Sequence, residues 1–573
     1  MTAMTANRGR ADQAPAGPHD SAVVVDYAKL MSLLSSPHSA TLHERHAAAV
    51  NRVCRVHEHA GGIPLSDLDD MEGVVRFVYK RVADKELSAP FEETLVSLMK
   101  LYASPFLERA ASDPGRYANA TGRALTLISE CLSLHNAPAD SKIAACDAIR
   151  AFASPRQRES EPPRSERKQS SSNELGDALG GLGAAKPAPP EARLRERRAL
   201  AATAGCAPAC LRSLGLAENE KNEKLRLATL KAATELSRDD ACAQQMARVG
   251  VFDRLQTTFK LDFRNTCVFI AAELAWNVLE AIVVGEDEVD SEISLPHSNF
   301  FKTFASLLTR AACEAHGDAD KDLRNELFVV ARLLAERGGK WRVRVLHSGI
   351  LPTLMVCSTV PEWQKLDAQS QKLIPPTSCT TPARERDFEM KRLVWLLMTE
   401  ITRCADGAEV VLGADGGHFT KALLAHLAPN AGFPDHAGAV AAFEKIKNRW
   451  SRSQLVNLQT LALRSLTRLV PYAVDSFAFS GAVESAIAAV APENDAPLDG
   501  FDGRRAAALA FLERSARHGE SLATRIGGSH VAVEAALWTL DPTRGSSGEG
   551  LSTITGHLDV DTMGTTHHTH RVE

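Results

Sequence analysis

Apolar and polar positions follow helical spacing along most of the chain, most clearly from Arg264 to Ile282, RNTCVFIAAELAWNVLEAI. The polar positions in this stretch are separated by seven, four and three residues, so they fall on one stripe of a helix with 3.6 residues per turn. They are Thr266, Glu273, Asn277 and Glu280. All other faces are apolar, which is typical of a helix buried in a larger helical assembly. The polar residues also interrupt the stretch too often for a membrane span to be expected.

The same design recurs in five further stretches, which are Leu225–Ser237, Arg324–Glu336, Met390–Cys404, Leu455–Val470 and Arg504–Arg517. A helix with one narrow polar stripe cannot bury its apolar faces alone, so repeated copies predict a stack of helical units, or solenoid. Amphipathic helices are also predicted nearer the N-terminus, at Val25–Leu34, Leu42–His57, Met71–Val82, Phe91–Ala103, Arg123–Leu134 and Lys142–Phe152.

Short glycine-centred turns precede several of the predicted helices. Their glycines are Gly205, Gly250, Gly349, Gly417, Gly481 and Gly527. We expect each glycine to end one helix in a left-handed conformation and the apolar pair after it to start the next. Gly205 and Gly250 are 45 residues apart, and Gly481 and Gly527 are 46 apart. Both distances match the armadillo and HEAT repeats, whose period is about 40–47 residues.

Composition supports a helical fold, because aromatic residues make up only 5% of the chain and strand-like alternation is almost absent. The predicted fold is therefore an all-α, armadillo/HEAT-like, right-handed α-solenoid with disordered termini and an internal linker. Proline, serine and glycine concentrate in the segments that we expect to be disordered. The predicted parts are a disordered N-terminus at 1–20, N-terminal helical repeats at 21–153, a disordered linker at 154–192, armadillo-like repeats at 193–540 and a disordered tail at 541–573.

Charge and motifs exclude several classes of function. The net charge of −5 gives no general attraction for nucleic acid or an acidic membrane, so neither is an expected partner. The phosphate-loop, GxSxG, HExxH and dinucleotide-binding motifs are absent, so we expect no enzyme activity, catalytic residue or cofactor. Cys206 and Cys210 share a helix face but have no further ligands nearby, which indicates two packed thiols and no metal site. The N-terminus has no apolar signal segment, so a soluble intracellular protein is expected.

Particular stretches resemble a known family. SGILPTLMVC at Ser348–Cys357 resembles the glycine turn and following helix of an armadillo repeat, and Leu225–Ser237 resembles an armadillo third helix. AAELAWNVLEAI at Ala271–Ile282 and DFEMKRLVWLLMTEI at Asp387–Ile401 resemble the ciliary armadillo family of cilia- and flagella-associated protein 69. Family members are generally longer, and the linker and insertions here look different from theirs, which leaves the partner contacts open.

The resemblance implies a non-catalytic scaffold of the ciliary or flagellar axoneme, located in the cytoplasm and cilium. It would form part of a projection from the central-pair microtubules, the central apparatus, and support motility. Its partners would be other axonemal proteins, the subunits of that projection. Two other functions stay open. One is a soluble armadillo adaptor that binds extended peptides in transport or signalling, and the other is an enzyme or enzyme regulator with its site in the groove.

In armadillo repeats the third helix of each repeat lines the concave groove, where extended partners bind. The polar stripes are therefore predicted to face such a groove, and the candidate residues are Glu273, Asn277, Glu280, Arg332, Arg392 and Arg403. Trp276 and Asn277 are adjacent and not a turn apart, so the Trp–Asn ladder of nuclear-import adaptors is not reproduced. The alternative is that each stripe is only the solvated face of a helix.

Overall fold

A computed structural model describes residues 25–36, 40–84, 89–102, 114–155, 190–283, 293–314, 318–358, 387–414, 417–427, 452–479, 481–490 and 501–533. Within these ranges the regular structure is helical and no β-strand occurs, which confirms the all-α prediction. The segments predicted to be disordered at 1–20 and 541–573, and residues 156–189 of the predicted linker, lie outside the described residues.

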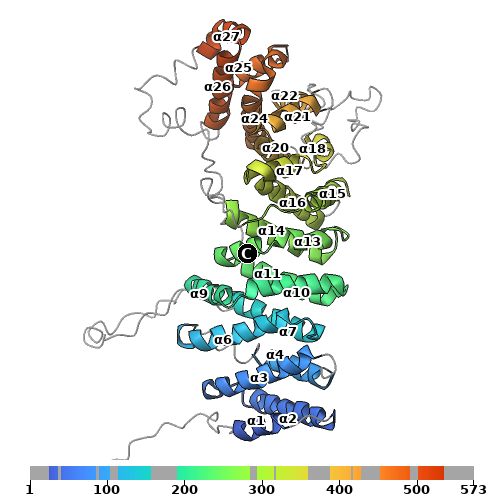
Figure 1. Ribbon diagram of the computed structural model, residues 1–573. Helices are drawn as coiled ribbons and strands as arrows, with labels where there is room; N and C mark the ends of the chain where they lie inside the picture. The colour runs from blue at the N-terminus through green and yellow to red at the C-terminus, as the bar shows by residue number, and fades with distance from the viewer. Residues whose placement is uncertain are drawn as a thin grey trace, which may run out of the picture. The chain divides into compact units, whose positions relative to one another are not determined.

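The chain divides into two compact units, Met1–Ser294 and Leu295–Glu573. Within each unit the helices are layered in the order of the sequence (Figure 1). The α-helices of the first unit are α1 Tyr27–Leu34, α2 Ala40–His59, α3 Leu68–Ala83, α4 Glu92–Leu101, α6 Pro114–Ser133, α7 Ala139–Ala153, α9 Pro190–Thr203, α10 Cys206–Asn219, α11 Glu223–Ser237, α12 Asp240–Arg248, α13 Val251–Phe259 and α14 Thr266–Val283. Two short 3₁₀ helices, Leu65–Asp67 and Ala89–Phe91, precede α3 and α4.

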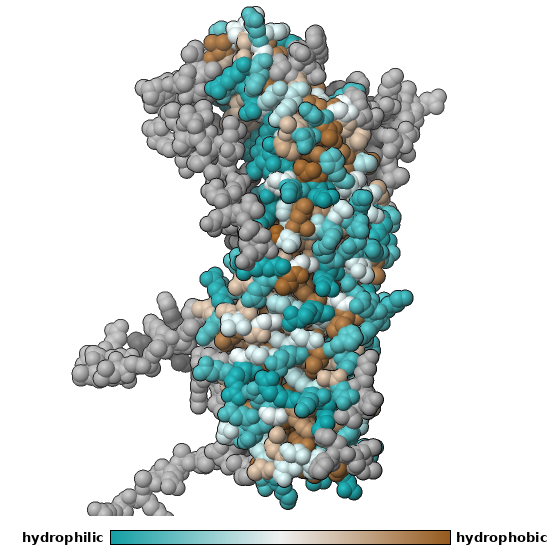
Figure 2. All heavy atoms as spheres, viewed as in Figure 1, coloured by the Kyte–Doolittle hydropathy of each residue, from teal (hydrophilic) through white to brown (hydrophobic). Residues whose placement is uncertain are grey.

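The second unit contains the remaining described helices. They are α15 Ser298–Glu314, α16 Asp318–Glu336, α17 Gly339–Leu346, α18 Leu351–Ser358, α20 Phe388–Ile401, α21 Ala405–Gly413, α22 His418–Leu427, α24 Arg452–Phe479, α25 Ala482–Val490, α26 Phe501–His518 and α27 Glu520–Gly527. Within the second unit, hydrophilic side chains cover much of the face in view and apolar side chains appear as patches between them (Figure 2).

Groups of three helices repeat along each unit. In the first unit, α9, α10 and α11 pack together, and α12, α13 and α14 form the next group. In the second unit, α17, α18 and α20 are followed by α21, α22 and α24. The third helix of each group packs on the third helix of the next, in the orders α7, α11, α14 and α16, α20, α24, α26. We call these the third helices, and their stacking forms the spine of each unit.

Helix α14, the most apolar predicted helix, lies in the core of the first unit. Its length and hydropathy would allow it to cross a membrane, as would the bent pair Glu191–Thr203 and Cys206–Asn219 taken as one span. In the structure α14 packs on α11, α12 and α13, and side chains such as Val268, Leu274 and Val278 are fully buried. Burial by neighbouring helices to this extent is typical of a helix in a protein core.

The glycine turns have the predicted backbone at five of six positions. Gly205 and Gly250 have φ values of 71° and 78° and are the N-caps of α10 and α13. Gly349, Gly417 and Gly481 also have positive φ. Gly527 was predicted to match them, and this was wrong, because it is the last residue of α27 and has no positive φ. The next residue, Gly528, is right-handed at φ −74°, so the chain continues its helical winding there.

Two arginines of α9 contact the C-terminal end of α7, the helix that precedes it among the described elements. Arg198 Nε donates to the carbonyl oxygen of Ala153 at 3.1 Å, and Arg197 Nη2 donates to that of Ser154 at 3.2 Å. Both arginines are buried on α9, and both acceptors lie at the end of α7. A cation beside the last carbonyl groups of a helix is favoured by the helix dipole. These contacts therefore fix the middle of α9 on the end of α7.

In the second unit, an aromatic pair ties the third helix α20 to α22. Trp395 is fully buried, and its Nε1 donates to His426 Nε2 at 3.4 Å. His426 Nδ1 lies 2.7 Å from the carbonyl oxygen of Ala422 and donates to it. Complete burial lowers the pKa of His426 to about 3, so the ring is neutral at physiological pH. A neutral imidazole has one donor and one acceptor, which is what this pair of contacts requires.

Gly407 in α21 provides a test of how closely successive repeats approach. A Cβ atom at this position would lie 2.0 Å from the carbonyl oxygen of Ile401, the last residue of α20. We expect Gly407→Ala to force the backbone apart and lower the free energy of unfolding by about 1–3 kcal/mol. The measurement is urea unfolding of the full chain followed by circular dichroism.

Gly413→Ala is the matched control, because it lies on the same helix and no atom would come within 4 Å of its Cβ. We expect it to be neutral or stabilising by up to about 1 kcal/mol, since alanine is the better helix former. Equal destabilisation by the two substitutions would show that the contact with Ile401 is not the cause.

Candidate functional site

The structure places the predicted groove residues on third helices of the two units. Glu273, Asn277 and Glu280 lie on α14 in the first unit. Arg332 lies on α16 and Arg392 on α20 in the second unit. Arg403 was expected inside the same helix as Arg392, but α20 ends at Ile401, so Arg403 lies in the turn that follows.

Glu273 takes part in a row of alternating charges in the first unit. Its Oε1 accepts from Nη2 of Arg238, the residue that follows α11, at 2.9 Å. Arg238 also lies 3.4 Å from Glu235 Oε2, which is 3.7 Å from Arg198 Nη2 on α9. The row therefore runs from α9 through α11 to α14. Glu273 keeps 29% of its side chain exposed and Arg238 keeps 36%, so the outer end of the row faces solvent.

The other two candidates on α14 differ in exposure. Asn277 is only 5% exposed, and its Nδ2 donates to Ser237 Oγ on α11 at 3.0 Å. Glu280 is exposed and accepts a hydrogen bond from Trp276 Nε1, one helical turn before it. Asn277 therefore holds two third helices together, whereas the carboxylate of Glu280 lies at the surface.

A second set of charges joins α16, α20 and α24 in the second unit. Glu400 is 2% exposed, and its Oε2 lies 3.0 Å from Arg403 Nε. Burial raises the pKa of Glu400, while the positive charges of Arg403, Arg468 and Arg332 oppose that rise. Arg332 on α16 also lies 3.5 Å from Glu336 Oε2.

Helix α24 reaches back to α20 through two further polar contacts. Arg468 Nη1 donates to the carbonyl oxygen of Thr399, and the hydroxyl groups of Thr399 and Ser465 are 3.0 Å apart.

Arg392 differs from the other candidates, because its guanidinium pairs at 2.6 Å with Glu389 on the first turn of its own helix. It has 20% of its side chain exposed.

The two units use the same short motif at the end of a third helix. Thr-Glu-x-x-Arg occurs at Thr234–Arg238, across the C-terminal end of α11, and at Thr399–Arg403, across the C-terminal end of α20. In both copies the glutamate pairs with the arginine three residues later. In both, the threonine hydroxyl contacts the following third helix, at the carbonyl oxygen of Ile270 in one and at Ser465 in the other. We call these two copies the TExxR motifs.

The sequence prediction of the site missed residues that these contacts make prominent. Glu235, Arg238, Glu400 and Arg468 were not among the predicted candidates. The matching five-residue motifs were a signal that could have found three of them. Arg468 had no such signal, because its contact with Thr399 depends on how α24 packs on α20.

Within the described residues, the geometry does not favour a metal-binding site or a reactive thiol at Cys206 and Cys210. No group of three or more His, Cys, Asp or Glu side chains within it has the geometry to hold a metal ion. Cys206 and Cys210 are fully buried, and burial raises the pKa of Cys206 to about 12. Such a thiol remains protonated and is a poor nucleophile or ligand. The chemistry that the third helices offer is that of paired charges and hydrogen bonds.

Three-helix groups, left-handed glycines before the second helix and stacked third helices together define an armadillo-type α-solenoid. The family model for the armadillo repeat of cilia- and flagella-associated protein 69 matches residues 25–176 and 191–485. The chain therefore belongs to the cilia- and flagella-associated protein 69 armadillo-repeat family, which confirms the resemblance found in the sequence.

Curated relatives carry the same name at low identity. Cilia- and flagella-associated protein 69 of Homo sapiens is 22% identical over 457 residues, covering 79% of this chain and 42% of the relative. The Mus musculus protein is 22% identical over 429 residues, covering 74% of this chain and 39% of the relative. The chain thus spans less than half the length of the curated relatives it matches.

Solved structures of helical-repeat proteins also match. A structure of the UNC-45 chaperone, which binds and folds muscle myosin, is 12% identical with a TM-score of 0.43, over 91% of this chain and 45% of that one. A chain from a structure concerning cadherin and β-catenin is 11% identical with a TM-score of 0.39, over 91% of this chain and 88% of that one. Scores this low carry no argument, so the fold assignment rests on the helices and the family model.

Removing Arg403 tests the charge set around Glu400. Arg403→Met deletes the nearest cation, and we expect the free energy of unfolding to fall by about 2 kcal/mol at neutral pH. Because burial raises the folded pKa of Glu400, the cost of its ionised form appears as pH rises above the usual glutamate value. The loss should therefore shrink near pH 4, which urea titrations at several pH values will measure.

Two variants control this experiment. Arg392→Met breaks a pair whose carboxylate, Glu389, is 40% exposed, and should cost less than about 0.5 kcal/mol. Glu400→Gln in the Arg403→Met background should restore most of the lost stability at neutral pH. A loss that is the same at every pH, and unchanged by Glu400→Gln, would mean that packing and not charge is responsible.

Proposed function

We propose that the protein is a non-catalytic scaffold of the ciliary or flagellar axoneme, forming part of a central-apparatus projection that motility requires. The observation that carries this proposal is the match of the family model to two long ranges of the chain. The names of the curated relatives associate those proteins with cilia and flagella, and repeat folds commonly act by presenting extended binding surfaces. Location in the cilium, axonemal partners and the absence of catalysis belong to this proposal.

The third helices supply the binding surface of this proposal within each unit. Glu273 and Arg403 are partly exposed while held by partners in the protein, so their charges are positioned before a ligand arrives. Arg332 and Arg392 are held in the same way by Glu336 and Glu389. Preorganised groups lose less conformational entropy on binding. Glu280 adds an exposed carboxylate, and Asn277 contributes by fixing α14 against α11.

Detergent extraction of ciliated cells tests the location. If the tagged chain is an axonemal component, most of it should stay with the axoneme after detergent removes the membranes, because its contacts are with proteins of the microtubule framework. The measurement is the retained fraction by imaging and immunoblot, with a freely soluble tagged protein as the control for release. A diffuse or nuclear signal released by detergent would favour the alternative, an armadillo adaptor for transport or signalling.

A charge reversal tests whether the third helices provide the contact. Glu280→Lys changes an exposed residue of α14, whereas Glu220→Lys changes an exposed residue that follows the second helix α10. We expect a lower retained fraction for the first variant and no change for the second, with equal thermal stability. Equal retention of the two variants would remove Glu280 from the contact surface.

A further inference from the structure

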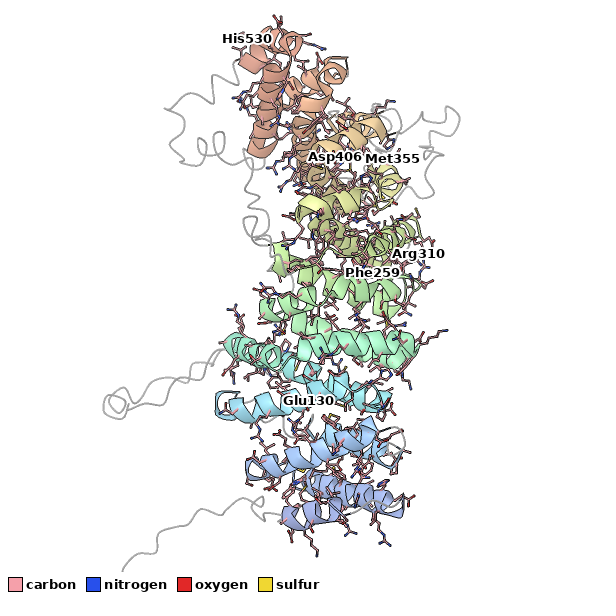
Figure 3. The ribbon with its side chains drawn as sticks, in the orientation of Figure 1. Glu130, Phe259, Arg310, Met355, Asp406 and His530 are labelled. Carbon is pink, nitrogen blue, oxygen red and sulfur yellow. The ribbon has the colours of Figure 1, made fainter. Side chains whose placement is uncertain are left out.

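A cleft of the first unit lies on helices that the proposed function does not use. It has a volume of about 570 Å³ and is lined by α3, α6, the turn before α10 and α10 itself. Glu130 on α6 marks its position (Figure 3). The third helices α11 and α14 contribute none of its lining, so the cleft is a separate surface from the TExxR motif of this unit.

Positive charge exceeds negative charge around this cleft. Its charged lining residues are Arg76, Lys80, Arg212 and Glu130. Arg76 is compensated, because it pairs with Glu72 at 2.9 Å and with Glu130 at 3.2 Å. Arg212 donates to a neutral group, Ser133 Oγ, from Nε at 3.1 Å and from Nη2 at 2.9 Å. Lys80 forms no ion pair within the described residues.

The remaining lining is apolar or already hydrogen-bonded. Tyr79 is 7% exposed and its hydroxyl group donates to the carbonyl oxygen of Leu127. Tyr79 therefore presents its aromatic ring to the cleft. Ser129 is buried and its hydroxyl group donates to Cys206 Sγ at 3.2 Å. Leu134 and Ala83 complete an apolar wall. The cleft thus combines an apolar surface with two cations, Lys80 and Arg212, that have no carboxylate partner in the part of the chain that the structure describes.

We propose that this cleft binds an acidic peptide segment of a partner protein. A glutamate or aspartate carboxylate of the peptide would accept hydrogen bonds from Lys80 and Arg212, and an aliphatic neighbour would cover Tyr79 and Leu134. A charge-assisted hydrogen bond to a carboxylate is stronger than the neutral bond that Arg212 makes to Ser133. A long polyanion such as nucleic acid fits less well, because the chain as a whole carries a net charge of −5.

Fluorescence anisotropy with the full chain tests the proposal. The probe is a fluorescein-labelled hexapeptide of alternating leucine and glutamate, and its control has glutamine in place of glutamate. We expect saturable binding of the glutamate peptide only, with an affinity that falls as salt is raised. Lys80→Glu and Arg212→Glu should each weaken binding at least tenfold. Lys80→Met, which removes the charge and keeps the length, should weaken it by a smaller factor.

Lys100→Glu is the matched control, because Lys100 is an exposed lysine of α4 in the same unit and does not line the cleft. It should bind the glutamate peptide within twofold of the unaltered chain, and all variants should show the same helical content by circular dichroism. The proposal is overturned if the glutamine peptide binds equally well, if Lys100→Glu is as weak as Lys80→Glu, or if the unaltered chain gives no saturable binding. Retention on the axoneme is measured separately and does not depend on this outcome.

Discussion

The packing of each third helix on the next is the contact on which both units depend. Most of its free energy comes from apolar burial, at about 25 cal/mol for each Å² removed from water. Val268 and Leu274 on α14 and Trp395 on α20 are fully buried apolar side chains of third helices. Apolar contact is non-directional, however, and would permit one helix to slide along its neighbour. The polar contacts of the third helices are directional, and they join particular residues on successive helices.

The charged residues in these contacts contribute more to the register between neighbouring third helices than to the stability of the fold. Moving a carboxylate such as Glu400 out of water costs several kcal/mol, which a nearby guanidinium repays only in part. Burial, together with the nearby charge of Glu336, raises the pKa of Glu400 despite the positive charges of its three arginine neighbours. A shifted register would leave that carboxylate buried without Arg403, at a higher cost still. The recurrence of the TExxR motif in both units is consistent with this role.

The repeating part of the fold could be predicted from the sequence because local residue patterns determine it. Helical spacing located the helices, and left-handed glycines such as Gly205 and Gly250 marked the turns between them. Helix ends were less accurate: the helix predicted to end at Val470 is followed by a kink at Ala473, after which a second helical segment continues to Phe479. Periodicity cannot reveal such an extension, because it depends on contacts with helices distant in the sequence.

The candidate site was harder to predict for a related reason. A polar stripe in a sequence does not say whether its residues face solvent or a neighbouring helix. Asn277 and Glu280 lie on one predicted stripe, yet the first is buried against Ser237 and the second is exposed. Which side chains are already paired depends on the angle and offset at which successive third helices stack. Tertiary packing sets this angle and offset, and they cannot be derived from a single sequence.

The contacts of Arg197 and Arg198 with the end of α7 have a consequence for how this chain tolerates change. They hold the middle of α9 against the end of α7, and these are the two helices that flank residues 156–189. In general, the entropy of closing a loop grows only with the logarithm of its length, so each doubling adds about 0.6 kcal/mol. Residues between these anchored ends can therefore be gained or lost over evolutionary time at small thermodynamic expense. Loss of the two arginines would weaken this joint, which the packing of α9 on α6, α7 and α12 would still hold.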